Sequence, residues 1–511
     1  MRHRGDPRRL SRRSVLALAS GMASLVGVGV LAACGGTAPA TTNSPPATAT
    51  TAPAPAATTA PTAVPTTAPT TVATIVPTAV PTAAPTTAPT VAPSAAAAVS
   101  AAKLTLDVWN ADWGDIYNKD MAKIGDSYSQ AHPEVMITWK WMTKPQDQLT
   151  AAIAGGAPPD ANYTNYVFLP EMAFQGAQLP LDKYLQQSGM KPTDFIPAMW
   201  QAAQYQGHTY ALPGGSDWIV LFWNKETFRM VGLDPETPPK TLQELESFSN
   251  KLYKADAAGN YTMMGIPPKV FGLQQNAFLM GGGFYDEGTG KLTANDPNNI
   301  KALEWEVSMA KRWDQTKIDA FTKNMPSYSK TGSGFGTNKQ AFLNTGFWAY
   351  EPLDKFSPDL KYGIAYDPTP DGTPEERSRY LIQGWDYGIP TGAKHAAESW
   401  DFVKYAFYDQ AALMGSETIN GPCVLKSFPD FLSQVEKNIG ANNRMAPYLK
   451  VFTDVAGVGS KFWPVLPMSA QYSTAIGKAE SDAIAGKGAP RDLLDGVQTA
   501  MTALLEQQLK K

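Results

Sequence analysis

The chain has 511 residues, of which 17% are charged, and its formal net charge is −3 at pH 7. The first 33 residues hold six Arg and one Asp, a local charge of +5, which leaves −8 for the rest. A mildly acidic body argues against nucleic acid as a partner, and the length allows a large hydrophobic core.

The N-terminal segment has the pattern of an export signal. Six Arg precede an uncharged run over residues 14–33, which ends in small residues before Cys34. A basic region, an apolar region and small residues before a cleavage point are typical of a signal peptide. Glycines make the run a poor permanent membrane anchor, so we expect residues 1–33 to be removed.

Two resemblances refine this expectation. The order Leu-Ala-Ala-Cys at 31–34 resembles the lipobox of bacterial lipoproteins, which implies that Cys34 is lipidated and becomes the first mature residue. Residues 11–16, SRRSVL, resemble a twin-arginine export signal with Val15 where that signal prefers Phe. We therefore expect a protein anchored by lipid to the outer face of the cytoplasmic membrane.

Residues 35–102 consist almost entirely of Ala, Thr, Pro, Val and Ser and carry no charge. Such a segment buries too little apolar surface to offset the entropy of ordering it. We interpret residues 34–102 as the lipidated Cys34 followed by a disordered stalk, and we place the start of the folded body near Lys103.

Beyond Lys103 the pattern alternates between strands and helices. Apolar residues at alternate positions predict a strand ending at Trp109 and a second strand over 135–141, with a helix between them. A helix around 146–154 leads to a third short strand. This order predicts a parallel, doubly wound sheet whose ligands lie beyond the carboxyl ends of its strands. The residues expected there are Trp109, Asp112, Trp113 and Asn165.

The stretch over residues 210–228 indicates a chain crossing. Gly214 and Gly215 allow unusual backbone angles, so the chain could turn there between two lobes. Asp217 and Trp218 follow, at the start of an apolar strand over 219–223. A carboxylate beside an indole suits a sugar, because one accepts hydroxyl hydrogen bonds and the other stacks. The alternative interpretation is a buried strand with a surface Asp.

Farther along, Asp296 and Pro297 have the pattern of a helix N-terminus. Ten of the thirteen Trp can be divided by context. Trp at strand or helix spacing favour core packing: Trp139, Trp200, Trp305, Trp313 and Trp400. Trp next to Gly or at strand ends favour ligand contact: Trp109, Trp113, Trp218, Trp348 and Trp385. Stacking on flat apolar faces favours a carbohydrate ligand.

Seven landmarks together resemble extracellular solute-binding proteins of family 1, the maltose-binding-protein-like components of bacterial ABC sugar importers. They are YQGHTYALP (205–213), LFWNKETF (221–228), PPKTLQEL (238–245), GGGFYDEGTGKLTANDP (281–297), GFWAY (346–350), GWDYGIP (384–390) and PMSAQY (467–472). The resemblance covers essentially all of residues 103–511. It implies an α/β, two-lobed periplasmic-binding-protein-like fold of type II, with a doubly wound sheet in each lobe and a hinge between them.

The resemblance also implies lobe boundaries and site residues. The first lobe would hold residues 103–213 and 368–422, and the second 216–366 and 425–511. The ligand site implied by the resemblance and by the patterns above comprises Asp112, Trp113, Asn165, Asp217, Trp218, Trp348, Trp385, Asp386 and Tyr472. Thr164 stands where the maltose binder has a stacking Trp, so the sugar stays open between mono- and oligosaccharides.

Two alternatives to a sugar transport receptor remain open. Asp217 with Asp386 would supply the two carboxylates of a glycoside hydrolase, although the spacing does not require it. A polyamine would also be attracted to Asp and Trp. We expect no metal, because the His residues are isolated and no Cys cluster exists, and no cofactor. The expected partners are a carbohydrate, the transmembrane subunits of an ABC permease and the membrane, with the protein itself a monomer.

Overall fold

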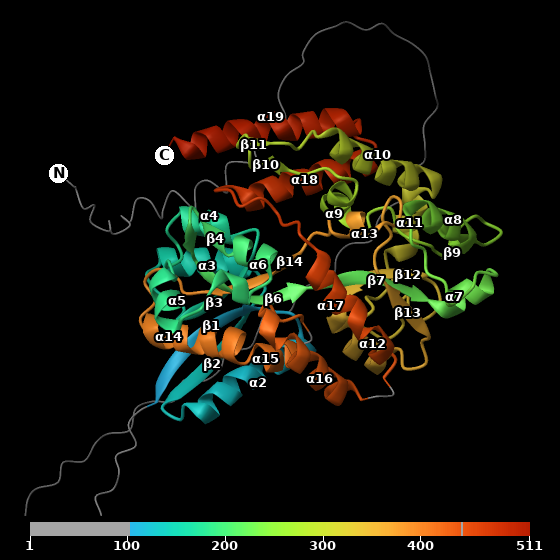
Figure 1. Cartoon of the computed structure of the whole chain (residues 1–511). Helices are drawn as coiled ribbons and strands as arrows, with labels where there is room; N and C mark the ends of the chain where they lie inside the picture. The colour runs from blue at the N-terminus through green and yellow to red at the C-terminus, as the bar shows by residue number, and fades with distance from the viewer. Residues whose placement is uncertain (1–102, 419, 441–442, 511) are drawn as a thin grey trace, which may run out of the picture. The chain divides into compact units, whose positions relative to one another are not determined.

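The computed structural model describes residues 103–418, 420–440 and 443–510 (Figure 1). The predicted signal peptide (1–33) and stalk (34–102), including Cys34, lie outside the described residues. No described helix is both long enough and apolar enough to cross a bilayer.

A five-stranded sheet forms the first half of the fold. Its strand order is β2 (Val135–Met142), β1 (Leu104–Ala111), β3 (Ala161–Asn165), β14 (Gln383–Gly388) and β6 (Ala211–Asp217). β1 pairs in parallel with β2 and β3, whereas β14 runs antiparallel to β3 and β6. The predicted parallel β-α-β-α-β unit is therefore confirmed, and its two crossover helices are α2 (Asp115–Ala131) and α3 (Pro145–Ala154).

A three-stranded sheet forms the second half. β7 (Ile219–Asn224) lies between β12 (Phe342–Gly346) and β13 (Tyr362–Ala365), and both neighbours run antiparallel to it. α12 (Tyr350–Phe356) connects the two outer strands. In this sheet β12, α12 and β13 form a crossover unit, and β7 is the antiparallel strand that lies between its two strands.

The remaining helices lie between these strands in the sequence and after them. Between β3 and β7 these are α4 (Leu169–Phe174), α5 (Asp182–Ser188) and α6 (Pro197–Ala202), and between β7 and β12 they are α7 (Lys225–Met230), α8 (Leu242–Leu252), α9 (Gly272–Leu279), α10 (Pro297–Arg312) and α11 (Gln315–Thr322). After β13 they are α13 (Pro374–Arg377), α14 (Ala396–Lys404), α15 (Ala411–Thr418), α16 (Phe428–Ile439), α17 (Leu449–Val458), α18 (Ser469–Ile484) and α19 (Pro490–Leu509), and Figure 1 shows α18 and α19 side by side. The short strand pairs are β4 (Gln204–Tyr205) with β5 (His208–Thr209), β8 (Lys254–Ala255) with β9 (Tyr261–Met263), and β10 (Tyr285–Asp286) with β11 (Lys291–Leu292).

The helix start predicted at Asp296 is confirmed. The Asp296 side chain accepts a hydrogen bond of 2.7 Å from the backbone N–H of Asn298, and Pro297 is the first residue of α10. This bond satisfies one of the N–H groups that a helix leaves without a partner in its first turn.

The chain first passes between the sheets at Trp218, because β6 ends at Asp217 and β7 begins at Ile219. Gly214 and Gly215 lie within β6 and have no positive φ, so they do not form the predicted turn. A Cβ atom at either position would come within 2.4 Å of the Trp385 ring. These glycines are required because an indole packs directly on the backbone, which corrects the sequence-based interpretation.

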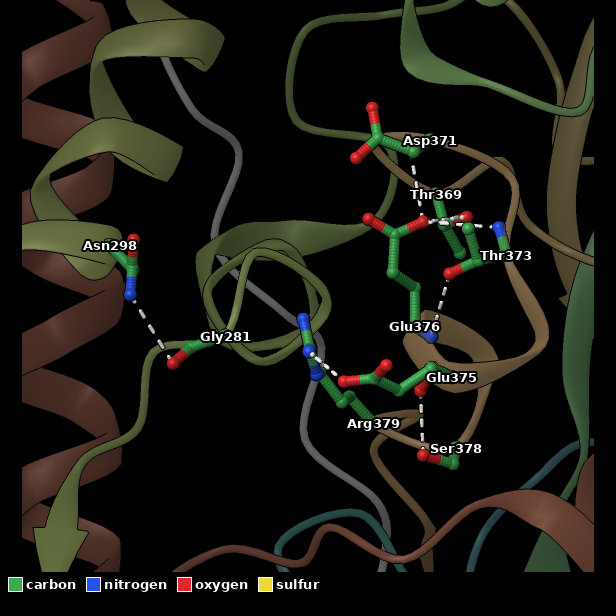
Figure 2. Close-up of polar contacts among 9 residues, drawn as sticks. All are labelled: Gly281, Asn298, Thr369, Asp371, Thr373, Glu375, Glu376, Ser378 and Arg379. Atoms are coloured by element: carbon green, nitrogen blue, oxygen red, sulfur yellow. Dashed lines mark hydrogen bonds and ion pairs between the residues drawn. The ribbon is translucent and has the colours of Figure 1, made fainter.

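The second connection covers residues 366–382, between β13 and β14 (Figure 2). The buried carboxylate of Glu376 accepts hydrogen bonds of 2.9 Å from the Thr369 hydroxyl and from the backbone N–H of Asp371. Thr373 caps α13 through the backbone N–H of Glu376, and Arg379 pairs with Glu375 at 2.9 Å. The connection is therefore ordered by its own side chains.

A buried carboxyl pair joins three helices of the second half. Glu306 of α10 is fully buried and accepts a hydrogen bond of 2.6 Å from Asn276 of α9. Glu480 of α18 is its neighbour, forms an ion pair of 3.0 Å with Lys269 and accepts from the backbone N–H of Leu273. Burial, and then the charge of Glu480, hold the pKa of Glu306 well above its usual range.

Replacing Glu306 by Gln should stabilise the protein at alkaline pH. The raised pKa means that the folded state keeps a proton which the unfolded state has lost, so wild-type stability falls as the pH rises above the ordinary Glu value near 4.3. The loss should be at most about 1.4 kcal/mol per pH unit, and the variant should not show it. Melting curves from pH 5 to 9 measure this, with Glu304→Gln on the exposed side of α10 as the control. Parallel pH profiles for wild type and Glu306→Gln would contradict it.

Candidate functional site

A cavity of about 300 Å³ lies where the first connection leaves the five-stranded sheet. Eight residues line it: Trp113, Tyr117, Tyr163, Asp217, Tyr328, Trp348, Trp385 and Asn420. Four of them were predicted from the sequence, namely Trp113, Asp217, Trp348 and Trp385. They come from the loop after β1, the end of β6, the turn after β12 and β14.

Three aromatic rings form one side of the cavity. Trp113 lies 5.6 Å from Tyr163 and 5.4 Å from Trp385, measured between ring centroids. Tyr163 is on β3 and Trp385 is on the adjacent β14, so the five-stranded sheet fixes two of the rings. The backbone of Gly214 and Gly215 supports the Trp385 ring from behind.

Trp348 forms the facing wall. Its indole N–H donates a hydrogen bond of 3.0 Å to the Tyr328 hydroxyl, and its ring packs on Gly346. The Tyr117 hydroxyl of α2 donates to the Trp348 carbonyl oxygen at 3.1 Å. Through this bond α2, which follows β1 of the five-stranded sheet, contacts the turn that follows β12 of the three-stranded sheet.

Asp217 supplies the only carboxyl group among the described residues that line the cavity. It is the last residue of β6 and is partly exposed to the cavity. Burial raises its pKa to about 7. No Lys or Arg belongs to this described lining, so Asp217 lacks a cation to hold it ionised and takes up a proton near neutral pH.

Asp112 and Asn165 support the lining residues without lining the cavity themselves. Asp112 accepts hydrogen bonds from the Asn118 side chain (2.7 Å) and from the backbone N–H of Gly114 (3.0 Å), which lower its pKa and hold the turn that carries Trp113. Asn165 accepts from the backbone N–H of Val167 at 3.2 Å and lies opposite Trp385 in the sheet. The oxygen atoms of both side chains are thus occupied by groups close in the sequence.

The structure places three predicted site residues in the protein interior instead. Trp218 is 1% exposed and packs between Phe428 and Phe431, each with its ring centroid 5.5 Å away. Tyr472 is fully buried, and its hydroxyl donates to the Phe284 carbonyl oxygen at 2.9 Å. These two positions are corrected to core residues, because the rings that would stack on a ligand are covered by other side chains.

Asp386 is the third correction. It is fully buried, does not line the cavity, and follows Trp385 directly, so it faces the other side of the strand. Neither carboxyl oxygen has a hydrogen-bond partner among the described residues, and burial holds the pKa of Asp386 well above its usual range. Asp386 therefore does not share the cavity that Asp217 lines.

Four lining residues were not predicted. Tyr163 lies two residues before Asn165 on the same strand, so it shares a face with that predicted residue, and this spacing contained a signal. Tyr117 lies in the first turn of α2, directly after the loop that carries Trp113. Tyr328 and Asn420 come from irregular segments far away in the sequence. No local pattern places them at the site.

A larger cavity, of about 740 Å³, contains none of the predicted site residues. Its lining includes Gln204, Tyr205, Asp286, Lys461 and Phe462. Among the described residues no group of three or more His, Cys, Asp or Glu side chains is arranged to hold a metal ion. The smaller aromatic cavity with Asp217 is therefore the candidate ligand site.

Comparison with known proteins places this geometry in a family. Residues 109–412 match the model of the family described as bacterial extracellular solute-binding protein. The maltotriose-binding protein of Pyrococcus abyssi is 24% identical over 291 residues, which cover 55% of this chain and 58% of that protein. The sn-glycerol-3-phosphate-binding periplasmic protein UgpB of Salmonella typhimurium is 28% identical over 331 residues, covering 59% and 70%.

Solved structures agree with this result. CpMnBP1 with mannotriose bound has a TM-score of 0.66 and 28% identity, covering 78% of this chain and 99% of its own. The maltose/maltodextrin-binding domain MalE of Bdellovibrio bacteriovorus has a TM-score of 0.61 at 18% identity, covering 80% of this chain and all of its own. These neighbours confirm the predicted two-lobed α/β fold. The chain belongs to the family of bacterial extracellular solute-binding proteins.

Proposed function

We propose that the protein is the sugar-binding component of an ABC importer and that it holds a short, uncharged saccharide in the cavity of about 300 Å³. The observation that carries the proposal is the combination of three indoles, three phenols and one carboxyl group in a described lining that has no basic side chain. Relatives and structural neighbours that bind saccharides support it.

The lining matches the two kinds of surface that a sugar presents. The C–H faces of a pyranose ring would stack between the Trp348 wall and the Trp113 and Trp385 rings. Its hydroxyl groups would donate to Asp217 and exchange hydrogen bonds with the tyrosine hydroxyls and Asn420. A site that pairs every hydroxyl also discriminates strongly between sugars, because an unpaired buried polar group is costly.

The volume limits the ligand. At about 30 Å³ per water molecule, the cavity holds the equivalent of roughly ten waters, which suits one or two hexose rings. Mannobiose, bound by CpMnBP1, is therefore a suitable first probe, and mannotriose, which CpMnBP1 also binds, tests whether a third ring is accepted.

The lining disfavours the charged alternatives. Glycerol 3-phosphate, the ligand named for UgpB, would need positive side chains that the described lining does not have. A polyamine would need several carboxylates, and the cavity has Asp217 alone. The relatives are binding proteins, and Asp386 lies outside the cavity, so we propose binding without catalysis.

Delivery to a permease requires an extracytoplasmic location. The family is extracellular, and UgpB is named as a periplasmic protein. We propose that Cys34 carries a lipid that anchors this protein to the outer face of the membrane, on the basis of the Leu-Ala-Ala-Cys order. The partners would then be permease subunits at that membrane.

Trp348→Ala should weaken sugar binding about thirtyfold, roughly 2 kcal/mol, as expected for a buried aromatic anchor. The melting temperature of the unliganded protein should change little, because the ring faces a cavity.

A thermal-shift panel of mannobiose, mannotriose, glycerol 3-phosphate and spermidine identifies the ligand, which adds about 2.7 kcal/mol to the stability of the folded protein at 100 times its dissociation constant. Calorimetric titration then measures the variant. Tyr472→Phe, in the core, is the control that should lower stability and keep affinity. An unchanged affinity in Trp348→Ala would contradict the site.

Sugar affinity should decrease as the pH falls from 8 to 5. Sugar hydroxyl groups donate better to the ionised carboxylate of Asp217 than to its protonated form. Because the pKa of Asp217 is about 7, the carboxylate becomes protonated at acid pH. Below that pKa the affinity should fall by up to about tenfold per pH unit. Asp217→Asn should bind more weakly at pH 8 and show a flat profile. Titrations at four pH values check this, and identical profiles for the two proteins would disprove the role of Asp217.

Cys34→Ala should release the protein from the membrane into the medium, because a lipid on that residue would be the anchor. Fractionation of cells that express the full chain, followed by immunoblotting, measures the release. Cys423→Ala, which removes the buried second cysteine, is the control and should leave the distribution unchanged. A Cys34 variant that stays in the membrane fraction would show that another segment holds the protein there.

A further inference from the structure

A buried polar cluster ties the two connections between the sheets to each other. It joins Ile219, which follows the first crossing, to Asp367 and Tyr380 of the second connection. Asp367 is 3% exposed and Tyr380 is 4% exposed. Asn344 of β12 completes the cluster by donating to one Asp367 oxygen at 2.8 Å and to the Val220 carbonyl at 3.3 Å.

The hydrogen atoms in this cluster can be counted. The Tyr380 hydroxyl oxygen is within hydrogen-bond contact of two other oxygens, the carbonyl oxygen of Ile219 at 2.5 Å and the second carboxyl oxygen of Asp367. A phenol has one proton and can donate it to only one of them. A carbonyl oxygen has none to give, so the other contact needs a proton from Asp367.

We propose that Asp367 is protonated in the folded protein and donates to Tyr380, which in turn donates to Ile219, so that a single carboxyl proton holds the two connections together. The order of donation is then Asp367 to Tyr380 to the Ile219 carbonyl. Removing the proton forces the Tyr380 hydroxyl to turn to the carboxylate, which leaves the carbonyl at the first crossing without a partner. The connections would separate more readily, and lobe movement would become pH dependent.

The surroundings of Asp367 support a neutral carboxyl group. The groups that face it are Asn344 from β12 and Tyr380, and no described Lys, Arg or His contacts it. Charged groups on the same connection have other partners, since Glu376 binds Thr369 and Asp371 while Arg377 lies over the Tyr366 ring. Burial raises the pKa of Asp367 to about 7.

Asp367→Asn tests the proposal with the full chain. The amide N–H of Asn donates to Tyr380 and its oxygen accepts from Asn344, so the variant reproduces the protonated pattern at every pH. In the wild type the stabilisation is present at acid pH and is lost as the pH rises through about 7. The melting temperature of the variant relative to wild type should therefore increase by roughly 5 °C between pH 5 and pH 8. Asp371→Asn, exposed on the same connection, should show no such change.

Two further measurements separate this role from a general effect on stability. The infrared band of a protonated carboxyl group should titrate near neutral pH in wild type and lose one group in Asp367→Asn. Small-angle scattering of the unliganded chain should show a radius that grows from pH 5 to pH 8 in wild type only. Matching melting profiles, or an unchanged infrared band, would overturn the proposal. These outcomes do not depend on which solute the cavity binds.

Discussion

The packing of indole rings directly on glycine backbone is the constraint on which the rest of this structure depends. It recurs around the sheets, at Trp385 on Gly214 and Gly215, Trp223 on Gly363 and Trp218 on Gly421. A Cβ atom at any of these glycines would lie 1.9–2.4 Å from the ring, closer than atoms can approach. The large flat side chains therefore determine how near neighbouring segments lie and where the cavity walls stand.

Burial without a neighbouring cation is the second feature that the fold repeats. Asp217, Asp367 and Asp386 all have raised pKa values for the same main reason, desolvation. Their surroundings differ: Asp217 faces a cavity, Asp367 faces a tyrosine, and Asp386 faces no described hydrogen-bond partner. Desolvation thus raises the pKa of a carboxyl group at the candidate ligand site, at the junction between the two connections and in the core.

Local patterns predicted the elements that depend on local sequence. Alternation at Leu104, Leu106 and Val108 indicated β1, and Asp296 indicated the start of α10. The insertion of β7 between two later strands depends on pairing across more than a hundred residues, which no local period encodes. Gly214 and Gly215 do lie just before the first connection, as predicted, but they are required for the packing of the Trp385 ring and not for a turn.

Cavity-lining residues were predictable from the sequence where an aromatic or acidic side chain stands next to a strand end or a glycine. Trp113, Asp217, Trp348 and Trp385 stand beside strand ends or glycines, and the structure brings all four to one cavity. Trp218 carries the same local signal, and Tyr472 was expected from the family resemblance, but both are buried, because an aromatic ring can pack in a core as well as against a sugar. Tyr328 and Asn420 reach the cavity through tertiary folding alone.

The cavity has a spectroscopic consequence. Three of the thirteen tryptophans line it, and the Trp348 indole N–H already bonds to the Tyr328 hydroxyl. Indole emission responds to the polarity around the ring, so a saccharide that displaces water between these rings would change the colour and yield of the protein's own fluorescence. The chain thus contains an optical reporter of its occupancy, which needs no attached dye.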